Sequence, residues 1–173
     1  LDNKSKKIKE IFTRVLQGHL NLSNFKIKKN TSGSILDQVA RKKLKSIKLD
    51  YAHGTGHGVG YFLNVHEGPQ SISKLNKVKL KPGMILSNEP GYYEKGKFGI
   101  RIENLIYIKK IKRGMKFDNL TYAPIDKDLI VKKLLNKKEI LWLNRYHKSV
   151  YKTLKKYMNK KELNFLKNSC SNI

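Results

Sequence analysis

The chain is most informative at residues 51–69, which read Tyr51-Ala-His-Gly-Thr-Gly-His-Gly-Val-Gly-Tyr-Phe-Leu-Asn-Val-His-Glu-Gly-Pro69. Three of the five histidines, His53, His57 and His66, lie in this segment, and a glycine flanks His57 on each side. Small neighbours leave the His57 imidazole room to face a bulky ligand. We therefore expect a functional site centred on His57.

A phosphate-binding loop is the alternative reading of the glycines at positions 54, 56, 58 and 60. The dinucleotide motif GxGxxG would need a glycine at Val59, Tyr61 or Leu63, depending on the frame, and no Gly-Lys-Ser/Thr follows for a P-loop. The spacing therefore argues against phosphate binding.

Two later segments each place one carboxylate in an apolar, strand-like run: Met84–Tyr93 carries Glu89, and Gly99–Ile108 carries Glu103. A buried charge is costly unless it is paired or bound to a metal, so these glutamates call for a cation. One imidazole and two carboxylates form most of a site for a hard divalent metal such as manganese, with zinc or cobalt as alternatives.

Residues 84–86 and 100–108 have the highest β-branched content and are predicted to be strands, with turns between them at Pro90-Gly91 and Gly96. Their pairing as an antiparallel hairpin would bring Glu89 and Glu103 close together.

Three ordered blocks, HGTGHGVG, NVHEGP and NEPGYYEKGKFGIRIEN, resemble the Xaa-Pro aminopeptidases (aminopeptidase P) of metallopeptidase family M24. The resemblance implies an α+β "pita-bread" (creatinase/aminopeptidase-like) fold, with helices packed on a curved, mostly antiparallel sheet. Residues 1–112 would be the C-terminal half of the catalytic domain, and residues 113–173 the mostly helical extension of aminopeptidase P.

The same resemblance implies that two metal ions, with manganese expected, share five protein ligands. His57 and Glu89 would bind one of the ions, and Glu103 would bridge both. A carboxylate ligand can also relay a proton to the leaving proline nitrogen, which would give Glu89 a catalytic part.

Three further residues take roles without binding metal in this comparison. His66 would polarise the scissile carbonyl, and His53 would lie near the proline of the substrate. Arg101, two residues before Glu103 and so on the same face of a strand, would brace the metal carboxylates.

Two aspartate ligands of the family have no counterpart, because no aspartate here lies in an apolar strand and the matching strand would end just before Leu1. We therefore expect the C-terminal part of an enzyme that releases the N-terminal residue from Xaa-Pro peptides, using a hydroxide activated by two metals. The 173 residues alone are expected to be inactive.

Prolidase and methionine aminopeptidase are alternatives within the superfamily, but the FGIRIEN block and the WLNRYH segment of residues 142–147 favour aminopeptidase P. An alternative from a different functional class is a non-catalytic pita-bread module that binds protein or nucleic acid.

The formal net charge of +25 is compatible with such a module. However, the basic residues spread from Lys4 to Lys167, and only five of the 38 are Arg, the residue that nucleic-acid readers favour. A nucleic-acid partner is therefore not expected.

The chain has no apolar run of about 18 residues and a single cysteine, Cys170. We expect no membrane partner, a cytoplasmic location and, from the family, a homo-oligomer.

Hydrophobic periodicity predicts helices over Lys6–Leu20, Ser34–Ile47, Asn136–Met158 and Asn159–Leu166, the last two starting at capping boxes. We also predict strands at Phe62–Val65 and Leu120–Ile125 and a helical turn within residues 126–135. His19, Trp142 and His147 are interpreted as packing residues.

Overall fold

The computed structural model describes residues 6–62 and 64–173, which form two compact units. One unit combines residues up to Thr13 with residues 122–173, and the other comprises residues 14–121. The candidate site residues all lie in the second unit. A division of the chain at residues 112 and 113 remains a prediction.

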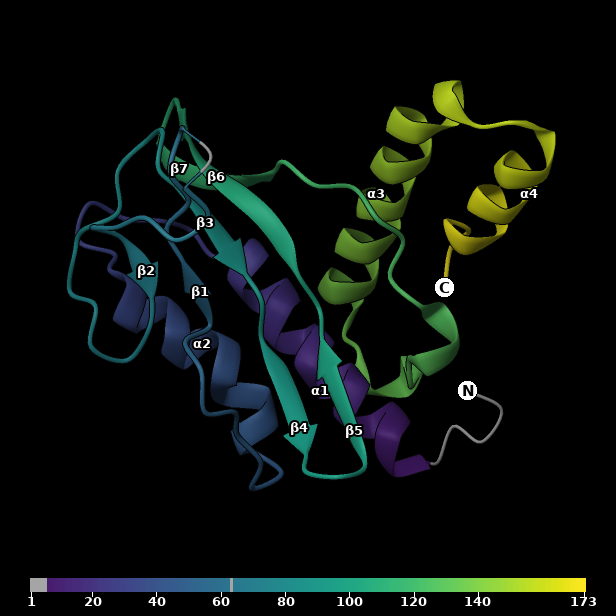
Figure 1. The fold of residues 1–173 in the computed structure, drawn as a ribbon, viewed down its shortest axis with the longest axis horizontal. Helices are drawn as coiled ribbons and strands as arrows, with labels where there is room; N and C mark the ends of the chain where they lie inside the picture. The colour runs from purple at the N-terminus through teal and green to yellow at the C-terminus, as the bar shows by residue number, and fades with distance from the viewer. Residues whose placement is uncertain (1–5, 63) are drawn as a thin grey trace. The chain divides into compact units, whose positions relative to one another are not determined.

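Two amphipathic helices precede the site in sequence. Helices α1 (Lys6–Ser23) and α2 (Gly33–Lys45) confirm the two expected helices, with ends shifted by a few residues. Ser34 was expected to cap α2, but the cap position is Ser32, and the two hydroxyls lie within hydrogen-bond distance at 2.9 Å. Figure 1 shows α1 and α2 on the same side of the strands.

The strands of the second unit pair antiparallel in three small sheets. The longest sheet has the order β3 (Ile85–Asn88), β6 (Asn104–Ile111), β7 (Gly114–Asn119). A hairpin of β4 (Gly91–Glu94) and β5 (Phe98–Arg101) extends from the β3 and β6 ends, and β1 (Gly56–His57) pairs with β2 (Ser71–Ile72).

The predicted antiparallel pairing of residues 84–86 with residues 100–108 is confirmed, although the second strand is not continuous. Residues Ile102 and Glu103 separate β5 from β6, and the Ile102 N–H donates to the carbonyl of Pro90. The last pair of the β3–β6 ladder is Asn88 with Asn104. Glu89 therefore directly follows Asn88 of this pair, and Glu103 directly precedes Asn104.

Two predicted strands are wrong. Residues 62, 64 and 65 form no strand, residue 63 lies outside the described residues, and Tyr61, Phe62 and Val65 are exposed. Leu120–Ile125 is also irregular, because the Ala123 and Ile125 amides donate to the side chains of Tyr146 and His147 rather than to a strand.

The core of the second unit joins both helices to the sheet. Its buried members are Leu22, Ile27, Leu36, Ala40, Ile72, Leu80, Leu86, Ile106, Ile108 and Phe117. His19 is also fully buried, in agreement with its interpretation as a packing residue. This burial lowers the pKa of its imidazole to about 4. Ile35 in the first turn of α2 is 41% exposed, so it lies off the buried apolar face of that helix.

The other unit is mainly helical. It contains the 3₁₀ turns η1 (Lys127–Leu129) and η2 (Lys132–Leu134), then α3 (Lys137–Leu154), the turn η3 (Lys155–Tyr157) and α4 (Lys160–Ser169). The predicted capping boxes at Asn136 and Asn159 are both present. The predicted helix to Met158 is too long, because α3 ends at Leu154, and Tyr157 beyond it is 70% exposed.

The packing interpretation holds for the two residues of α3. Trp142 stacks on Tyr146, with ring centroids 5.3 Å apart, and the buried His147 accepts the Ile125 amide at Nε2. Helices combined with antiparallel strands confirm the α+β class. Among the residues described, no helix has both the length and the apolar character needed to cross a membrane.

Candidate metal centre

The glycines around His57 allow close backbone packing. A Cβ at Gly56 would lie 2.0 Å from the Ser87 carbonyl oxygen, and one at Gly58 would lie 2.0 Å from the Glu67 carbonyl oxygen. The expectation that these glycines simply leave space for a ligand is therefore incomplete. They bring β1 against β3 and so set His57 beside the segment that carries Glu89.

Hydrogen bonds fix the orientation of His57. Its backbone N–H donates to Ser87 Oγ at 2.9 Å, and its Nδ1 lies 3.0 Å from the Gly58 carbonyl oxygen. Because a carbonyl can only accept, that contact places a proton on Nδ1. The neutral imidazole then carries its lone pair on Nε2, the usual arrangement of a metal-binding histidine.

Glu89 is 8% exposed, and its carboxylate is held from two sides. Ser87 Oγ donates to Oε1 at 2.9 Å, and Arg101 Nη1 lies 3.4 Å from Oε2. The Glu89 backbone N–H donates to the Thr55 carbonyl. Arg101 therefore lies beside this carboxylate, and its bracing role stays a prediction.

His57 Nε2 lies 3.4 Å from Glu89 Oε1. An imidazole nitrogen and a carboxylate oxygen that face each other at this distance can share a ring proton or bind the same cation. The pair therefore has the chemistry of two ligands to one divalent ion.

Glu103 occupies the break between β5 and β6. Arg101 and Glu103 are exposed and Ile102 between them is buried, but Glu103 lies outside the strand on which the shared face was expected. The expected burial of Glu103 is wrong. The described residues contain no group of three His, Cys, Asp or Glu side chains arranged to hold a metal ion. The structure thus brings His57 and Glu89 together and leaves the third expected ligand at the adjacent strand position.

His66 and His53 make different ring contacts. The His66 ring is 3.9 Å from the His57 ring, centroid to centroid, and its side chain is exposed. His53 packs between Tyr51 and Tyr93, at ring distances of 4.8 and 5.4 Å. Its Nε2 is buried, and no residue in the described part of the chain hydrogen-bonds to it.

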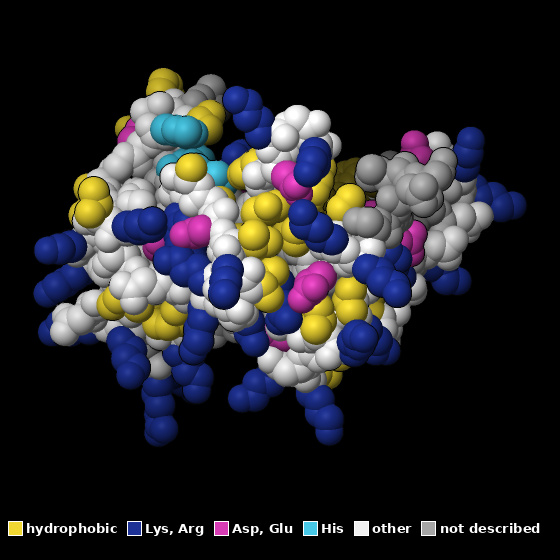
Figure 2. All heavy atoms as spheres, turned by 90° about the horizontal axis from the view of Figure 1, so that it is seen from below, with side chains coloured by type: hydrophobic (Ala, Val, Ile, Leu, Met, Phe, Trp, Pro, Cys, Tyr) yellow, Lys and Arg dark blue, Asp and Glu magenta, His cyan; other side chains and the backbone are white. Residues whose placement is uncertain are grey.

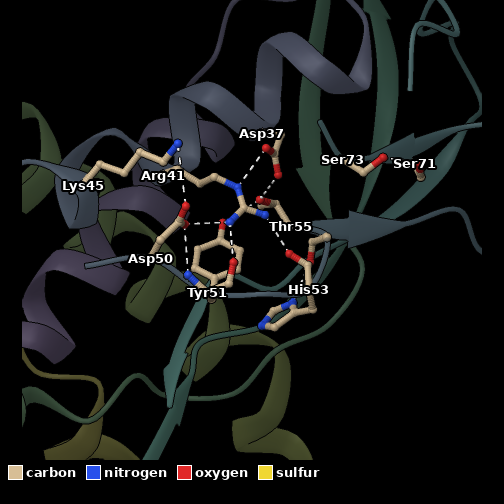
Figure 3. Close-up of polar contacts among 10 residues, drawn as sticks. Asp37, Arg41, Lys45, Asp50, Tyr51, His53, Thr55, Ser71 and Ser73 are labelled. Atoms are coloured by element: carbon tan, nitrogen blue, oxygen red, sulfur yellow. Dashed lines mark hydrogen bonds and ion pairs between the residues drawn. The ribbon is translucent and has the colours of Figure 1, made fainter. Parts of the chain in front are cut away.

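Sequence reasoning missed several supporting residues. Ser87 joins His57 to Glu89, and the Tyr93 hydroxyl accepts from Arg101 Nε at 2.8 Å. A further group on α2 and the following loop, centred on Arg41, holds the segment that precedes His57 (Figure 3). The i, i+4 spacing of Asp37 and Arg41 was the available sequence signal.

Figure 2 shows Lys and Arg side chains distributed over the visible face, whereas the histidine side chains gather in one region of it. This distribution agrees with a solvated, lysine-rich surface as the explanation of the charge.

Comparison with known proteins places this geometry in a family. The model of metallopeptidase family M24 matches residues 1–110, and the model of the C-terminal region of peptidase M24 matches residues 113–173. Xaa-Pro aminopeptidase 1 of Dictyostelium discoideum is 46% identical over 172 residues, which cover 92% of this chain and 27% of that protein.

Two solved structures extend the comparison. The X-prolyl aminopeptidase of Caenorhabditis elegans, described as a cytosolic enzyme with a di-nuclear active site, superposes with a TM-score of 0.91 at 40% identity, covering 98% of this chain and 29% of that one. The prolidase of Pyrococcus furiosus superposes with a TM-score of 0.61 at 31% identity, covering 69% and 34%.

These likenesses confirm the pita-bread fold, whereas the chain spans about a quarter of the length of the curated relatives it matches. Because the two family models match residues 1–110 and 113–173, and an imidazole and a carboxylate converge within the first of these ranges, the chain belongs to metallopeptidase family M24.

Proposed function

We propose that the chain supplies part of the active site of a dinuclear Xaa-Pro aminopeptidase, with His57, Glu89 and Glu103 as metal ligands. The observation that carries the proposal is the 3.4 Å approach of His57 Nε2 to the buried Glu89 carboxylate. The register that sets Glu103 beside the Asn88–Asn104 pair supports the third ligand. Manganese is the proposed native metal.

Two divalent ions bound there would supply Lewis acidity toward water and the scissile carbonyl. Glu89, held by Ser87 and Arg101, would accept a proton and pass it to the leaving proline nitrogen. His66 would donate a hydrogen bond to the carbonyl oxygen of the substrate. His53 would line the proline side, where its unpartnered Nε2 can meet the peptide.

An Xaa-Pro substrate is proposed because the D. discoideum and C. elegans proteins, which match 92% and 98% of the chain, are named for such bonds. An Xaa-Pro bond has no amide proton and a constrained ring, so a dedicated pocket is needed. The description of the C. elegans protein as cytosolic supports a cytoplasmic location here.

The test is hydrolysis of Xaa-Pro peptides with added Mn²⁺, comparing the 173-residue chain with the full-length product of its gene. We expect activity in the full-length product, and its loss in Glu103→Ala. Lys110→Ala, on the exposed end of β6, is the control that should retain activity. A folded full-length product that cleaves no Xaa-Pro peptide would refute the proposal.

A second candidate, a non-catalytic module that binds a polyanion, is favoured only by the net charge of +25. It predicts strong retention on heparin at physiological salt, with steep salt dependence.

A further inference from the structure

Arg41 is 2% exposed, although it lies in the lysine-rich helix α2. Its Nε donates to Asp37 Oδ2 at 2.8 Å, and its Nη1 donates to Asp50 Oδ1 at 2.7 Å. A buried guanidinium needs such partners, because its charge cannot be removed by deprotonation. The ion pairs account for its burial but leave its remaining donors to be explained.

Those donors reach the backbone just before His57. Nη1 donates to the Tyr51 carbonyl at 2.7 Å, and Nη2 donates to the His53 carbonyl at 2.6 Å (Figure 3). The guanidinium plane also lies over the Tyr51 ring, 3.9 Å from its centroid. One rigid, planar group thus fixes two alternate carbonyls of the loop.

We propose that Arg41 is a positioning residue, which holds the segment 50–55, and with it the His53 imidazole, in place relative to the His57–Glu89 pair.

A second path through the same cluster reaches Glu89. Thr55 Oγ1 donates to Asp37 Oδ1 at 2.7 Å, and Asp37 is only 1% exposed. The Thr55 carbonyl accepts the backbone N–H of Glu89 at 2.9 Å. The Asp37–Arg41 pair therefore fixes both His53 and the backbone at the candidate ligand Glu89.

The aromatic contacts of His53 complete the connection. Its ring lies between Tyr51, which Arg41 covers, and Tyr93, whose hydroxyl accepts from Arg101. Arg101 in turn contacts Glu89. A displacement of the Tyr51 and His53 carbonyls would therefore move the His53 ring, while the Ser87 hydrogen bonds would still hold His57 and Glu89 together.

Arg41→Lys separates positioning from charge. Lysine keeps the positive charge beside Asp37, but its single ammonium cannot serve both carboxylates and both carbonyls in one plane. Lys45→Ala is the matched control, because Lys45 approaches the other Asp50 oxygen at 3.6 Å with a side chain 54% exposed.

The primary readout is the set of histidine ring signals in long-range ¹H–¹⁵N spectra of the 173-residue chain, without metal. In Arg41→Lys we expect the His53 ring signals to shift or broaden, while the His147 signals keep their wild-type positions. Lys45→Ala should reproduce the wild-type spectrum. Unmoved His53 signals in a folded Arg41→Lys variant, or equal changes at every histidine, would overturn the proposal.

If Arg41→Lys does not fold, Asp50→Asn is the alternative variant. The Asp50 side chain is 34% exposed, and its replacement leaves no buried carboxylate unpaired. It should shift the His53 signals in the same direction and by less, and an unchanged His53 would overturn the proposal.

The catalytic part of the inference rests on the proposed function. In the full-length product with Mn²⁺, Arg41→Lys should lower kcat by up to about 10²-fold through misplacement of His53, with KM changed less. A wild-type protein without activity would refute the aminopeptidase proposal, whereas the His53 spectra would still decide the positioning role.

Discussion

Replacement of Gly56 by alanine is the sharpest single test of how the site is built. The new Cβ would lie 2.0 Å from the Ser87 carbonyl oxygen, so β1 and β3 must separate by at least 1.0 Å to reach even the 3.0 Å limit of real contacts. That separation would lengthen two hydrogen bonds: the one from the His57 N–H to Ser87 Oγ, now 2.9 Å, and the one from the Val59 N–H to the Ile85 carbonyl, now 3.1 Å.

Each weakened hydrogen bond is worth about 0.5–1.5 kcal/mol, so Gly56→Ala should lower the free energy of unfolding by about 1–3 kcal/mol. Urea unfolding followed by circular dichroism measures this change. The matched control is Gly54→Ala in the same motif, where the added Cβ meets its nearest atom at an ordinary 3.4 Å. Equal stability of the two variants would refute the argument that close approach, rather than space for a ligand, dictates Gly56.

Three further predictions concern the helical unit. Burial lowers the pKa of His147 to about 4, so the unfolded chain, with an ordinary pKa of 6.5, binds a proton first as the pH falls. The contribution of His147 to stability is full above pH 6.5 and should decline toward pH 4, by on the order of 3 kcal/mol. Because the buried His19 has a similarly lowered pKa, His147→Gln should remove about half of the slope in urea titrations at several pH values. Asn136→Ala removes the capping box of α3 and should lower the free energy of unfolding by about 1 kcal/mol. Asn164→Ala, at an exposed position in the middle of α4, is the control and should leave the free energy of unfolding unchanged. Equal effects of the two substitutions would contradict the capping role. Tyr146→Phe removes the hydroxyl that donates to the Ala123 carbonyl and should lower the melting temperature, and an unchanged value would show that this bond is dispensable.

The helices were predictable because their signals are local. Apolar spacing marks the buried faces of α1 and α3, and the Asn-x-x-Glu pattern marks the starts of α3 and α4. The misplaced strands show where local signals fail. Phe62 and Val65 resemble a strand but are exposed, whereas β7 carries charged residues on alternate positions of an edge strand and so resembles a loop.

The candidate metal ligands could be predicted from the sequence, whereas the residues that hold the ligand-bearing segments in place could not. His57 and Glu89 stand out as an imidazole and a carboxylate in apolar surroundings, and the structure brings them together. Arg41 gives only a weaker signal, its i, i+4 spacing from Asp37, because an arginine beside two lysines is typical of a solvated helix face. Its burial depends on Asp50 and on the Tyr51 and His53 carbonyls, contacts that exist only after the loop has folded back onto α2.

The exposed Glu103 is the remaining difference from expectation. Its neighbours in the β3–β6 ladder are in register, yet the carboxylate does not join His57 and Glu89 among the described residues.

Mn²⁺ binding by the full-length gene product tests the central claim most directly. We predict two ions per chain by calorimetry, with binding lost or strongly weakened in Glu103→Ala and His57→Ala and retained in Lys110→Ala. Wild-type binding that is indifferent to the removal of His57, Glu89 and Glu103 would contradict the assignment of these residues as the metal ligands.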